Sequence, residues 1–343
     1  METFVVLGFA LDTETVLLIF IMQVVKNIKD ITSQDRPLIL AMGCFDGVHI
    51  GHQKVISTAV KQAKDRDGDA WVFTFNPHPA KLLCPDKAPP LISAEPCRLR
   101  QFEALGVSGI IEISFTREYA QLSPEAFLTD LIEQAPNLSG IVCGQDWSFG
   151  HRASGKFQTL ESFGKQHGFT ATGVTHVLDK NGKISSTDIR NAVLDGNIPE
   201  AERMLGRPFS LFGTVIHGNK VGRELGFPTA NIDPLNELLP GSGVYTAYTR
   251  IQNEKLNVQN SELDIEKSTL YPSAVFVGKR ETFGCHKHVI ESYLLDFDDD
   301  LYDQIIEVSL VEKIREVNPF PSRKALIEQI RKDVAQTRAL LNV

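Results

Sequence analysis

Between residues 38 and 144, short apolar runs alternate regularly with longer amphipathic stretches. This alternation is typical of α/β folds, in which helices connect the parallel strands of a doubly wound sheet. We expect strands at residues 38–43, 70–75, 108–113 and 139–144, and helices at residues 51–64, 96–105 and 124–134. Ligands of such sheets bind outside the carboxyl ends of the strands, so the loops that follow these strands are where chemistry is expected.

The sequence changes character after residue 206. Five segments there are rich in β-branched and aromatic residues and are separated by glycine and proline, as in a small antiparallel barrel. These expected strands cover residues 209–217, 243–251, 273–277, 289–297 and 305–311. A helix is expected at residues 322–341, because Leu326, Ile330 and Val334 recur at helical spacing.

At 343 residues the chain is long enough for about two domains, and we expect the boundary at residues 205–208. This gives a first domain of residues 22–205 and a second of residues 206–343, in which the polar and aperiodic residues 252–270 form a surface insertion. Residues 1–21 stand apart, because acidic residues interrupt apolar runs that are too short to span a bilayer. Two interpretations stay open for them: an appended leader, with translation starting at Met22, or a helix or strand docked on the first domain.

Composition narrows the function classes. Apolar residues make up 42% of the chain and charged residues 23%, as in folded soluble proteins. The net charge of -8 argues against a nucleic-acid-binding protein, because such proteins usually carry a basic excess. The five cysteines are widely spaced and include no Cys-x-x-Cys pair, which excludes a disulfide framework and the common zinc patterns and fits a reducing compartment. We therefore expect a cytoplasmic protein that binds neither nucleic acid nor membrane.

The segment GCFDGVHIGHQ, residues 43–53, joins the first expected strand to the first expected helix. Its glycines let the backbone approach a ligand closely, and a helix start offers free amides and the positive end of the helix dipole. His49 and His52 can point together at one phosphate, where imidazoles would stabilise the charge that develops on the α-phosphoryl oxygens as pyrophosphate leaves. The alternative is two ordinary polar residues at a helix start, but their placement after the first strand favours the functional interpretation.

A second segment, ISSTDIR at residues 184–190, also begins an expected helix. Ser185, Ser186 and Thr187 can cap the free amides, and a cap at Ser186 alone would contribute on the order of 1 kcal/mol. The functional interpretation adds hydroxyl groups for the phosphate chain of a nucleotide and Arg190 as a fixed cation over it. Two phosphate-oriented helix starts in one sheet domain predict a nucleotide clamp.

This combination of motifs resembles the prokaryotic bifunctional riboflavin kinase/FAD synthetase family, whose N-terminal domain is a HIGH nucleotidyltransferase, and the resemblance covers residues 38–335. It implies a Rossmann-like domain with a parallel sheet, followed by a riboflavin kinase-like β-barrel with a C-terminal helix. It also implies attack of the FMN phosphate on the α-phosphorus of ATP, with Mg²⁺ bridging the ATP phosphates, to give FAD and pyrophosphate. The implied ATP contacts in the first domain include Gly43 and Phe45 besides the residues of the two motifs.

Two further segments resemble the flavin side of that family's first domain, FNPHP at residues 75–79 and GQDWSFGHRASG at residues 144–155. The residues that the resemblance places around FMN are Asn76, His78, Asp146 and Phe149, with Trp147 nearby. Alternatively, His78 is a plain loop residue in a Pro-His-Pro turn, and Trp147 is a core residue.

In the second half, GTVIHGNKVGRELGFPTAN at residues 213–231 resembles the riboflavin kinase signature. Its glycines, among them Gly213, Gly218 and Gly222, can let backbone amides wrap around ATP phosphates without a Walker lysine, or they simply form β-turns. A carboxylate base aligned with the γ-phosphate is the usual arrangement for phosphoryl transfer to an alcohol. The roles that the resemblance implies are Mg²⁺ binding by Thr229 and Asn231, proton acceptance from the riboflavin 5′-hydroxyl by Glu291, and flavin contacts by Arg315 and Phe320.

The barrel departs from the family pattern at three positions. The family usually has Asn-Ile-Gly-x-x-Pro-Thr-Phe where this chain reads FVGKRETF, so Phe276 replaces an asparagine and Glu281 a proline. Tyr293 stands where a histidine is common. Three functions stay open: a bifunctional enzyme that converts riboflavin to FMN and FMN to FAD, an FMN adenylyltransferase with a weakened kinase-like barrel, and a non-catalytic flavin or nucleotide sensor.

Overall fold

The computed structural model describes residues 22–31, 35–180, 182–218, 220–252, 269–282 and 285–343. The expected leader, residues 1–21, and most of the expected insertion at residues 252–270 lie outside the described residues. The chain forms two compact units. The first holds the described chain up to Pro89 together with Arg98–Ile184, and the second holds Pro90–Cys97 together with the described chain from Ser185 onward.

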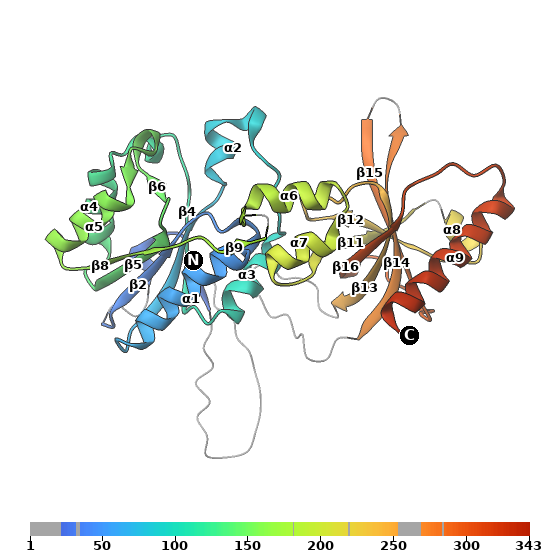
Figure 1. Cartoon of the computed structure of the whole chain (residues 1–343), viewed down its shortest axis with the longest axis horizontal. Helices are drawn as coiled ribbons and strands as arrows, with labels where there is room; N and C mark the ends of the chain where they lie inside the picture. The colour runs from blue at the N-terminus through green and yellow to red at the C-terminus, as the bar shows by residue number, and fades with distance from the viewer. Residues whose placement is uncertain (1–21, 32–34, 181, 219, 253–268, 283–284) are drawn as a thin grey trace, which may run out of the picture. The chain divides into compact units, whose positions relative to one another are not determined.

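The first unit is built on a parallel six-stranded sheet with the strand order β1-β4-β3-β2-β5-β8 (Figure 1). Its strands are β1 (Gln23–Val25), β2 (Leu38–Met42), β3 (Asp69–Phe75), β4 (Gly109–Ile113), β5 (Leu138–Gly144) and β8 (Thr170–Val174). The parallel sheet that the sequence predicts is therefore confirmed. β1 and β8 are additional strands at the two edges, which the apolar pattern does not indicate.

Helices cover both faces of this sheet, because successive side chains of each strand point to opposite faces. Leu38, Leu40 and Met42 of β2 belong to one core, which they share with α4 and α5. Ile39 and Ala41 belong to a second core, which they share with α1 and α3. These helices are α1 (Ile50–Lys64), α3 (Glu95–Ala104), α4 (Pro124–Gln134) and α5 (Phe157–His167). The two cores fix the strands, and the strands in turn fix the loops at their carboxyl ends.

Short elements occupy the loops of the first unit. They are α2 (Pro79–Leu83), β6 (Ser148–Phe149), β7 (Gly155–Lys156), β9 (Leu178–Asp179), β10 (Gly182–Lys183) and the 3-10 helices η1 (Ile28–Asp30), η2 (Asp46–Val48), η3 (Pro85–Lys87), η4 (Tyr119–Gln121) and η5 (His151–Ala153). β6 pairs with β7, and β9 with β10, in two small antiparallel ribbons. In the part of the chain that the structure describes, no helix is long and apolar enough to cross a membrane.

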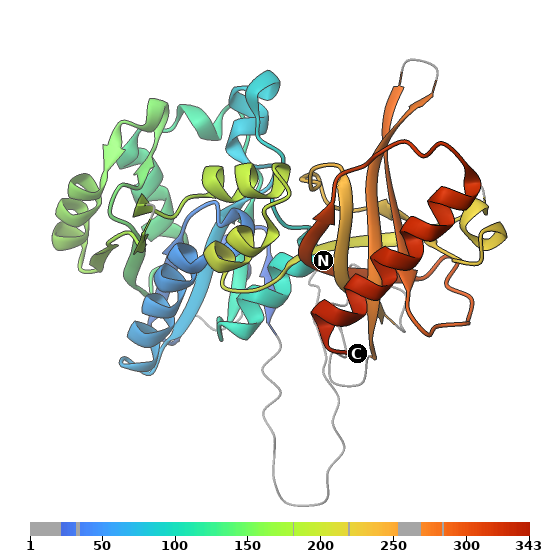
Figure 2. The same cartoon turned by 45° about the vertical axis from the view of Figure 1, so that its right-hand side comes forward.

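The second unit contains a closed barrel with the strand order β11-β12-β15-β14-β13-β16, in which every pairing is antiparallel. The strands are β11 (Phe209–Ile216), β12 (Ala230–Pro234), β13 (Gly243–Gln252), β14 (Leu270–Thr282), β15 (Cys285–Leu294) and β16 (Ile305–Arg315). The C-terminal helix α9 (Arg323–Leu341) packs on the outside of β13 and β14 (Figure 2). The predicted barrel and helix are thus confirmed, and β12 is a sixth strand that begins at the end of the glycine-rich motif.

Three shorter helices complete the second unit: α6 (Ser186–Leu194), α7 (Ile198–Leu205) and α8 (Val221–Glu224). α6 packs against α7, and α7 contacts β11 and β16 of the barrel. The division between the compact units therefore falls before Ser185, whereas the sequence pattern places a domain boundary at residues 205–208. That domain boundary stays a prediction.

Candidate active sites

The loop after β2 carries the His-Ile-Gly-His motif on a strained backbone. Phe45, Gly47 and Val48 have positive φ angles of 49°, 78° and 39°. Glycine adopts such angles freely, but a phenylalanine and a β-branched valine do not. The side chains of Phe45 and Val48 are fully buried, and this burial offsets the unfavourable backbone. Any contact of Phe45 with ATP would therefore come from its backbone. Strained turns of this kind cluster where function requires a fixed backbone.

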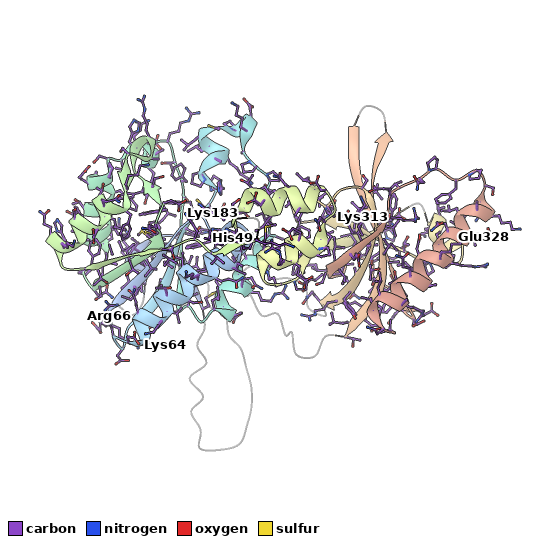
Figure 3. All side chains as sticks on the ribbon, in the orientation of Figure 1. His49, Lys64, Arg66, Lys183, Lys313 and Glu328 are labelled. Carbon is purple, nitrogen blue, oxygen red and sulfur yellow. The ribbon has the colours of Figure 1, made fainter. Side chains whose placement is uncertain are left out.

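His49 caps the start of α1 with its own side chain. Its Nδ1 atom accepts hydrogen bonds from the backbone amides of Gly51 at 3.1 Å and His52 at 3.4 Å. A neutral imidazole that accepts at Nδ1 carries its proton on Nε2, so the ring has a donor atom as well as the acceptor that caps the helix. The position of Gly51 favours glycine, because a Cβ atom there would lie 3.0 Å from the imidazole. Figure 3 shows His49 at one end of α1 and Lys64 at the other.

His52 stacks on His49 and is neutral. The two ring centroids are 3.7 Å apart, and Phe45 packs edge-on against His52 at 5.3 Å. Burial, and after it the charge of His49, lower the pKa of His52 well below its usual value of 6.5. The Nδ1 atom of His52 is buried and has no hydrogen-bond partner among the described residues. His52 therefore acts through hydrogen bonds rather than through a permanent charge, and its ring nitrogen without a partner suits a bound ligand.

The two segments that resemble the family's flavin side follow β3 and β5. These strands flank β2, and all three are parallel, so their loops lie at one edge of the sheet. After β3, the exposed Asn76 donates from Nδ2 to Glu112 at 3.2 Å. His78 caps α2 by accepting at Nδ1 from the amide of Ala80 at 3.2 Å. The structure thus brings Asn76 and His78 to the same sheet edge as His49.

The loop after β5 contributes a carboxylate and two stacked rings. Asp146 accepts a hydrogen bond from Lys183 at 2.5 Å and lies 3.3 Å from Nε2 of His176. Burial alone would raise the pKa of Asp146, but the hydrogen bond from Lys183, the charge of Lys183 and the nearby His176 outweigh it and lower the pKa. Trp147 stacks on Phe149 with ring centroids 4.6 Å apart, and both rings pack on the core beside α4. Trp147 therefore has at least the structural role that the sequence left open.

The second phosphate-oriented segment begins α6. The Oγ atom of Ser185 accepts from the amide of Asp188 at 3.3 Å and donates to the carboxylate of Asp188 at 2.6 Å. The helix cap is therefore Ser185 rather than Ser186, because the chain is already helical at Ser186. Ser186 and Thr187 lie in the first turn of α6, where hydroxyl groups and helix amides are close together.

Arg190 lies in α6 and is buried. Its Nε atom donates to the carbonyl of Pro90 at 2.8 Å, which fixes the guanidinium on the segment before α3. Both residues belong to the second compact unit, whereas His49 and His52 belong to the first. The convergence of the two motifs on one triphosphate stays a prediction.

In the barrel, strand pairing brings three of the implied kinase residues together. Asn231 of β12 lies directly opposite Glu291 of β15. Thr229 precedes β12, and its hydroxyl donates to Oε2 of Glu291 at 3.5 Å. A hydroxyl, an amide and a carboxylate are oxygen ligands of the kind that Mg²⁺ prefers. No group of three or more His, Cys, Asp or Glu side chains that could hold a metal occurs in the described part of the chain.

Two of the glycines that the sequence proposes as phosphate contacts, Gly218 and Gly222, lie against Asn231 and Thr229. A Cβ atom on Gly218 would fall 2.3 Å from the amide of Asn231, and one on Gly222 would fall 3.0 Å from the hydroxyl of Thr229. Gly213 differs, because it lies within β11, where a Cβ atom would fall 2.4 Å from Ile232. Gly218 and Gly222 therefore allow their loop to approach the oxygen ligands, whereas Gly213 allows two strands to pack.

The row of paired residues continues from Glu291 across the next three strands of the barrel. Glu291 lies opposite Phe276 of β14. Phe276 lies opposite Val244 of β13, which lies opposite Arg315 of β16. Paired residues of neighbouring strands lie side by side. The implied base, the ring that replaces the family's asparagine, and the implied flavin-binding arginine therefore form one row across four strands.

At its Arg315 end, this row contacts α9. Arg315 donates from Nε and Nη2 to the buried carboxylate of Asp333 at 2.9 and 2.8 Å, and its guanidinium lies 5.6 Å from the ring of Phe320. Near the other end, Tyr293 packs edge-on against Phe227 with ring centroids 5.6 Å apart. The structure thus brings Arg315 and Phe320 together. The side chain of Glu281 lies outside the described residues.

Sequence reasoning missed a cavity beside Thr229 and a buried carboxylate beside Asn76. The cavity has a volume of about 580 Å³, which is within the range of ligand sites. Besides Thr229 it is lined by Arg223, Ser292 and the acidic residues 298–300. The acidic run is visible in the sequence, but nothing there connects it to Thr229. No sequence signal marks the carboxylate, which is Glu112.

Comparison with known proteins adds three findings. A family model described as FAD synthetase matches residues 31–188, and one described as riboflavin kinase matches residues 205–341. A bifunctional riboflavin kinase/FMN adenylyltransferase from Buchnera aphidicola is 33% identical over 93% of this chain and 98% of its own length, and one from Escherichia coli is 31% identical over 92% and 97%. A crystal structure described as a macrolide-efflux protein from Streptococcus pneumoniae is 32% identical, with a TM-score of 0.79 over 92% of this chain and 98% of that one.

Proposed function

The chain belongs to the bifunctional riboflavin kinase/FMN adenylyltransferase family, and from this premise we propose that it makes FAD in two steps that each consume ATP. The second unit phosphorylates riboflavin to FMN, and the first transfers adenylate from ATP to FMN and releases pyrophosphate. Both family models match, and the relatives carry both activities in their names. The two alternatives, adenylyl transfer alone and a sensor without catalysis, are therefore not favoured.

The observation that carries the adenylyl step is the His49–His52 stack at the sheet edge that also holds Asn76 and Asp146. A phosphate oxygen of FMN attacks the α-phosphorus of ATP, and the bond to the bridging oxygen of pyrophosphate breaks. The Nε2–H of His49 donates to an α-phosphoryl oxygen as its charge grows. A preorganised donor of this kind accelerates such reactions by roughly 10²–10³.

Further residues are proposed to bind and align the two substrates. Asn76, His78, Asp146 and Phe149 are proposed to line the FMN side, with the buried Phe149 supporting the loop from below. Gly43 and Phe45 are proposed to contact ATP through their backbone. Ser185, Ser186, Thr187 and Arg190 keep their predicted role as contacts of the nucleotide phosphates. Alignment of this kind replaces covalent chemistry by the protein.

In the kinase step, Glu291 accepts the proton of the riboflavin 5′-hydroxyl while that oxygen attacks the γ-phosphorus of ATP. Thr229 and Asn231 fit Mg²⁺, because both carry oxygen ligands and both lie beside Glu291. Mg²⁺, when bound, neutralises phosphate charge. Gly218 and Gly222 permit the phosphate-binding loop to lie close to these ligands, while Gly213, also proposed from the sequence as an ATP contact, acts within β11.

Riboflavin is proposed to bind with its 5′-hydroxyl at Glu291, and Arg315 and Phe320 keep their predicted role as flavin contacts. The closed barrel separates Glu291 from Arg315 by three strand-to-strand steps in either direction, so their strands lie on opposite sides of it. Phe276 lies directly beside Glu291, where its ring can stack on an aromatic ligand.

Two incubations test the proposed function. Riboflavin with MgATP should yield FMN and then FAD, and FMN with MgATP should yield FAD and pyrophosphate, all separated by chromatography. FMN formed from riboflavin would exclude adenylyl transfer alone. Binding of FMN and ATP without release of pyrophosphate would instead support the sensor. We propose the cytoplasm as the site of the reaction, since both steps use cytoplasmic ATP.

A further inference from the structure

Glu112 is a buried carboxylate at the carboxyl end of β4, and three elements converge on it. Its residue is only 3% exposed. Oε1 accepts from Nη2 of Arg98 at 2.8 Å, and Oε2 accepts from Nδ2 of Asn76 at 3.2 Å and from Nζ of Lys26. Arg98 comes from α3, Asn76 follows β3 and Lys26 follows β1. All four side chains belong to the first compact unit.

The carboxylate is ionised despite its burial. Burial alone would raise the pKa of Glu112, but the hydrogen bonds from Lys26 and Asn76 and the charges of Arg98 and Lys26 outweigh it and lower the pKa. An ionised carboxylate accepts hydrogen bonds and cannot donate them. Asn76 must therefore turn its amide nitrogen toward Glu112.

This contact fixes which atom Asn76 presents to a ligand. With Nδ2 held by Glu112, the carbonyl oxygen Oδ1 faces away from the buried carboxylate. The backbone of Asn76 is fixed as well, because its amide donates to the carbonyl of Ile113 at 3.0 Å. Asn76 is exposed at the sheet edge that carries His49. An exposed acceptor in a fixed direction is suited to an N–H group of a planar heterocycle.

We propose that Glu112 is a positioning residue for flavin binding in the first unit: it holds the Asn76 amide with its oxygen toward an N–H of the flavin ring. Glu112 does not touch the flavin, but the affinity for FMN depends on it. This inference rests on the proposed adenylyl transfer to FMN. It goes further by assigning the amide orientation and the buried group that sets it.

The competing explanation is that Glu112 only stabilises the fold. Asp69 provides a matched control, because it is also a buried carboxylate in the same sheet and pairs with Arg36 at 3.0 Å. Asp69 begins β3, whereas Asn76 directly follows the end of that strand. Removing the charge of Asp69 should therefore lower the stability of the fold without changing the orientation of the Asn76 amide.

The test compares Glu112→Gln, Asn76→Ala and the double variant in the full chain. A glutamine places an N–H group among the three donors, so the Asn76 amide loses its fixed orientation. We expect Glu112→Gln to raise the KM for FMN about tenfold with little change in kcat, the size expected for one hydrogen bond. Riboflavin phosphorylation, measured on the same preparation, should stay unchanged and shows that the second unit is intact, while the nearly unchanged kcat for FAD formation shows that the first unit is folded.

Three outcomes would overturn the inference. The first is an equal rise of the KM for FMN in Asp69→Asn, which would mark a general effect of buried charge. The second is a further rise when Glu112→Gln is added to Asn76→Ala, because a residue that acts only through Asn76 has no effect once that amide is gone. Failure of the wild-type chain to form FAD from FMN would instead contradict the proposed function. Normal FAD formation with an unchanged KM in Glu112→Gln would contradict the positioning role alone.

Discussion

A histidine can cap a helix and donate a hydrogen bond at the same time, and His49 is placed to do both. Its Nδ1 atom accepts from two amides of α1, so a neutral ring carries its proton on Nε2, the donor proposed for the nucleotide. The two roles can be separated, because asparagine is an excellent helix cap but cannot place an N–H where the imidazole places it.

We expect His49→Asn to lower the rate of FAD formation from FMN by about a hundredfold while leaving the melting temperature near that of the wild type. His49→Ala should lose the same rate and, in addition, about 1 kcal/mol of stability. Steady-state kinetics and thermal unfolding measure the two effects. If His49→Asn kept full activity, the imidazole would serve only as a cap.

The neutral state of His52 has a consequence for stability. Its pKa in the folded chain lies well below 6.5, whereas in the unfolded chain the ring takes up a proton near that value. The unfolded state therefore binds more protons below about pH 6.5, and the free energy of unfolding falls as the pH falls. We expect the melting temperature of His52→Gln to drop less than that of the wild type between about pH 7.5 and about pH 5.5. Parallel pH dependences in the two proteins would show that His52 is not the group concerned.

Replacement of Glu291 tests whether riboflavin phosphorylation and adenylyl transfer take place at separate sites. Glu291→Gln keeps the size and the acceptor atom beside Thr229 but removes the base, so FMN formation from riboflavin should fall at least about a hundredfold. FAD formation from added FMN should be unchanged, and serves as the internal control. Equal loss of both activities in a folded variant would contradict the assignment of one reaction to each unit.

At the scale of elements, the first turn of α1 places Gly51 directly against the ring of His49. A Cβ atom on Gly51 would lie 3.0 Å from the ring of His49, so Gly51→Ala should displace the imidazole. We expect FAD formation to fall about tenfold with the fold retained, because alanine favours a helix by up to about 1 kcal/mol over glycine. Ser57→Ala, on the exposed side of the same helix, is the control and should leave the rate unchanged. An unaltered rate in Gly51→Ala would mean that the ring is free to shift without loss.

The elements that the sequence predicts are those whose own residues carry the signal. The buried strands β2, β3, β4 and β5 are rich in apolar residues, and both phosphate-oriented motifs begin helices. β1 has three residues, and β12 includes Asn231, Asp233 and Pro234, so pairing partners rather than local propensity make them strands. The contact of Glu112 with Asn76 has no local signal either, since it depends on the tertiary structure.

At the scale of the whole molecule, packing and domain resemblance divide the chain at different points. The riboflavin kinase model begins at residue 205, but α6 and α7 are grouped with the barrel. α7 buries Ile198, Ala201, Met204 and Leu205, and it contacts β11 and β16. The barrel therefore depends on a helix that precedes the segment matched by its family model.

Two fragments measure this dependence. Residues 185–343 and residues 206–343 both contain the candidate kinase site, but only the longer fragment keeps α7 on β11 and β16. Removing α7 exposes barrel surface and deletes buried side chains worth about 5 kcal/mol. We therefore expect residues 185–343 to unfold cooperatively and to phosphorylate riboflavin, and residues 206–343 to melt far lower or to lack a transition.

Calorimetry measures the unfolding of the two fragments, and the riboflavin assay measures their kinase activity. Met204→Ala in the full chain removes one of the buried α7 side chains and should lower the stability of the barrel less than loss of the whole helix does. Equal melting temperatures of the two fragments would mean that α7 rests on the barrel without stabilising it, and the boundary at residues 205–208 would then be the physical one.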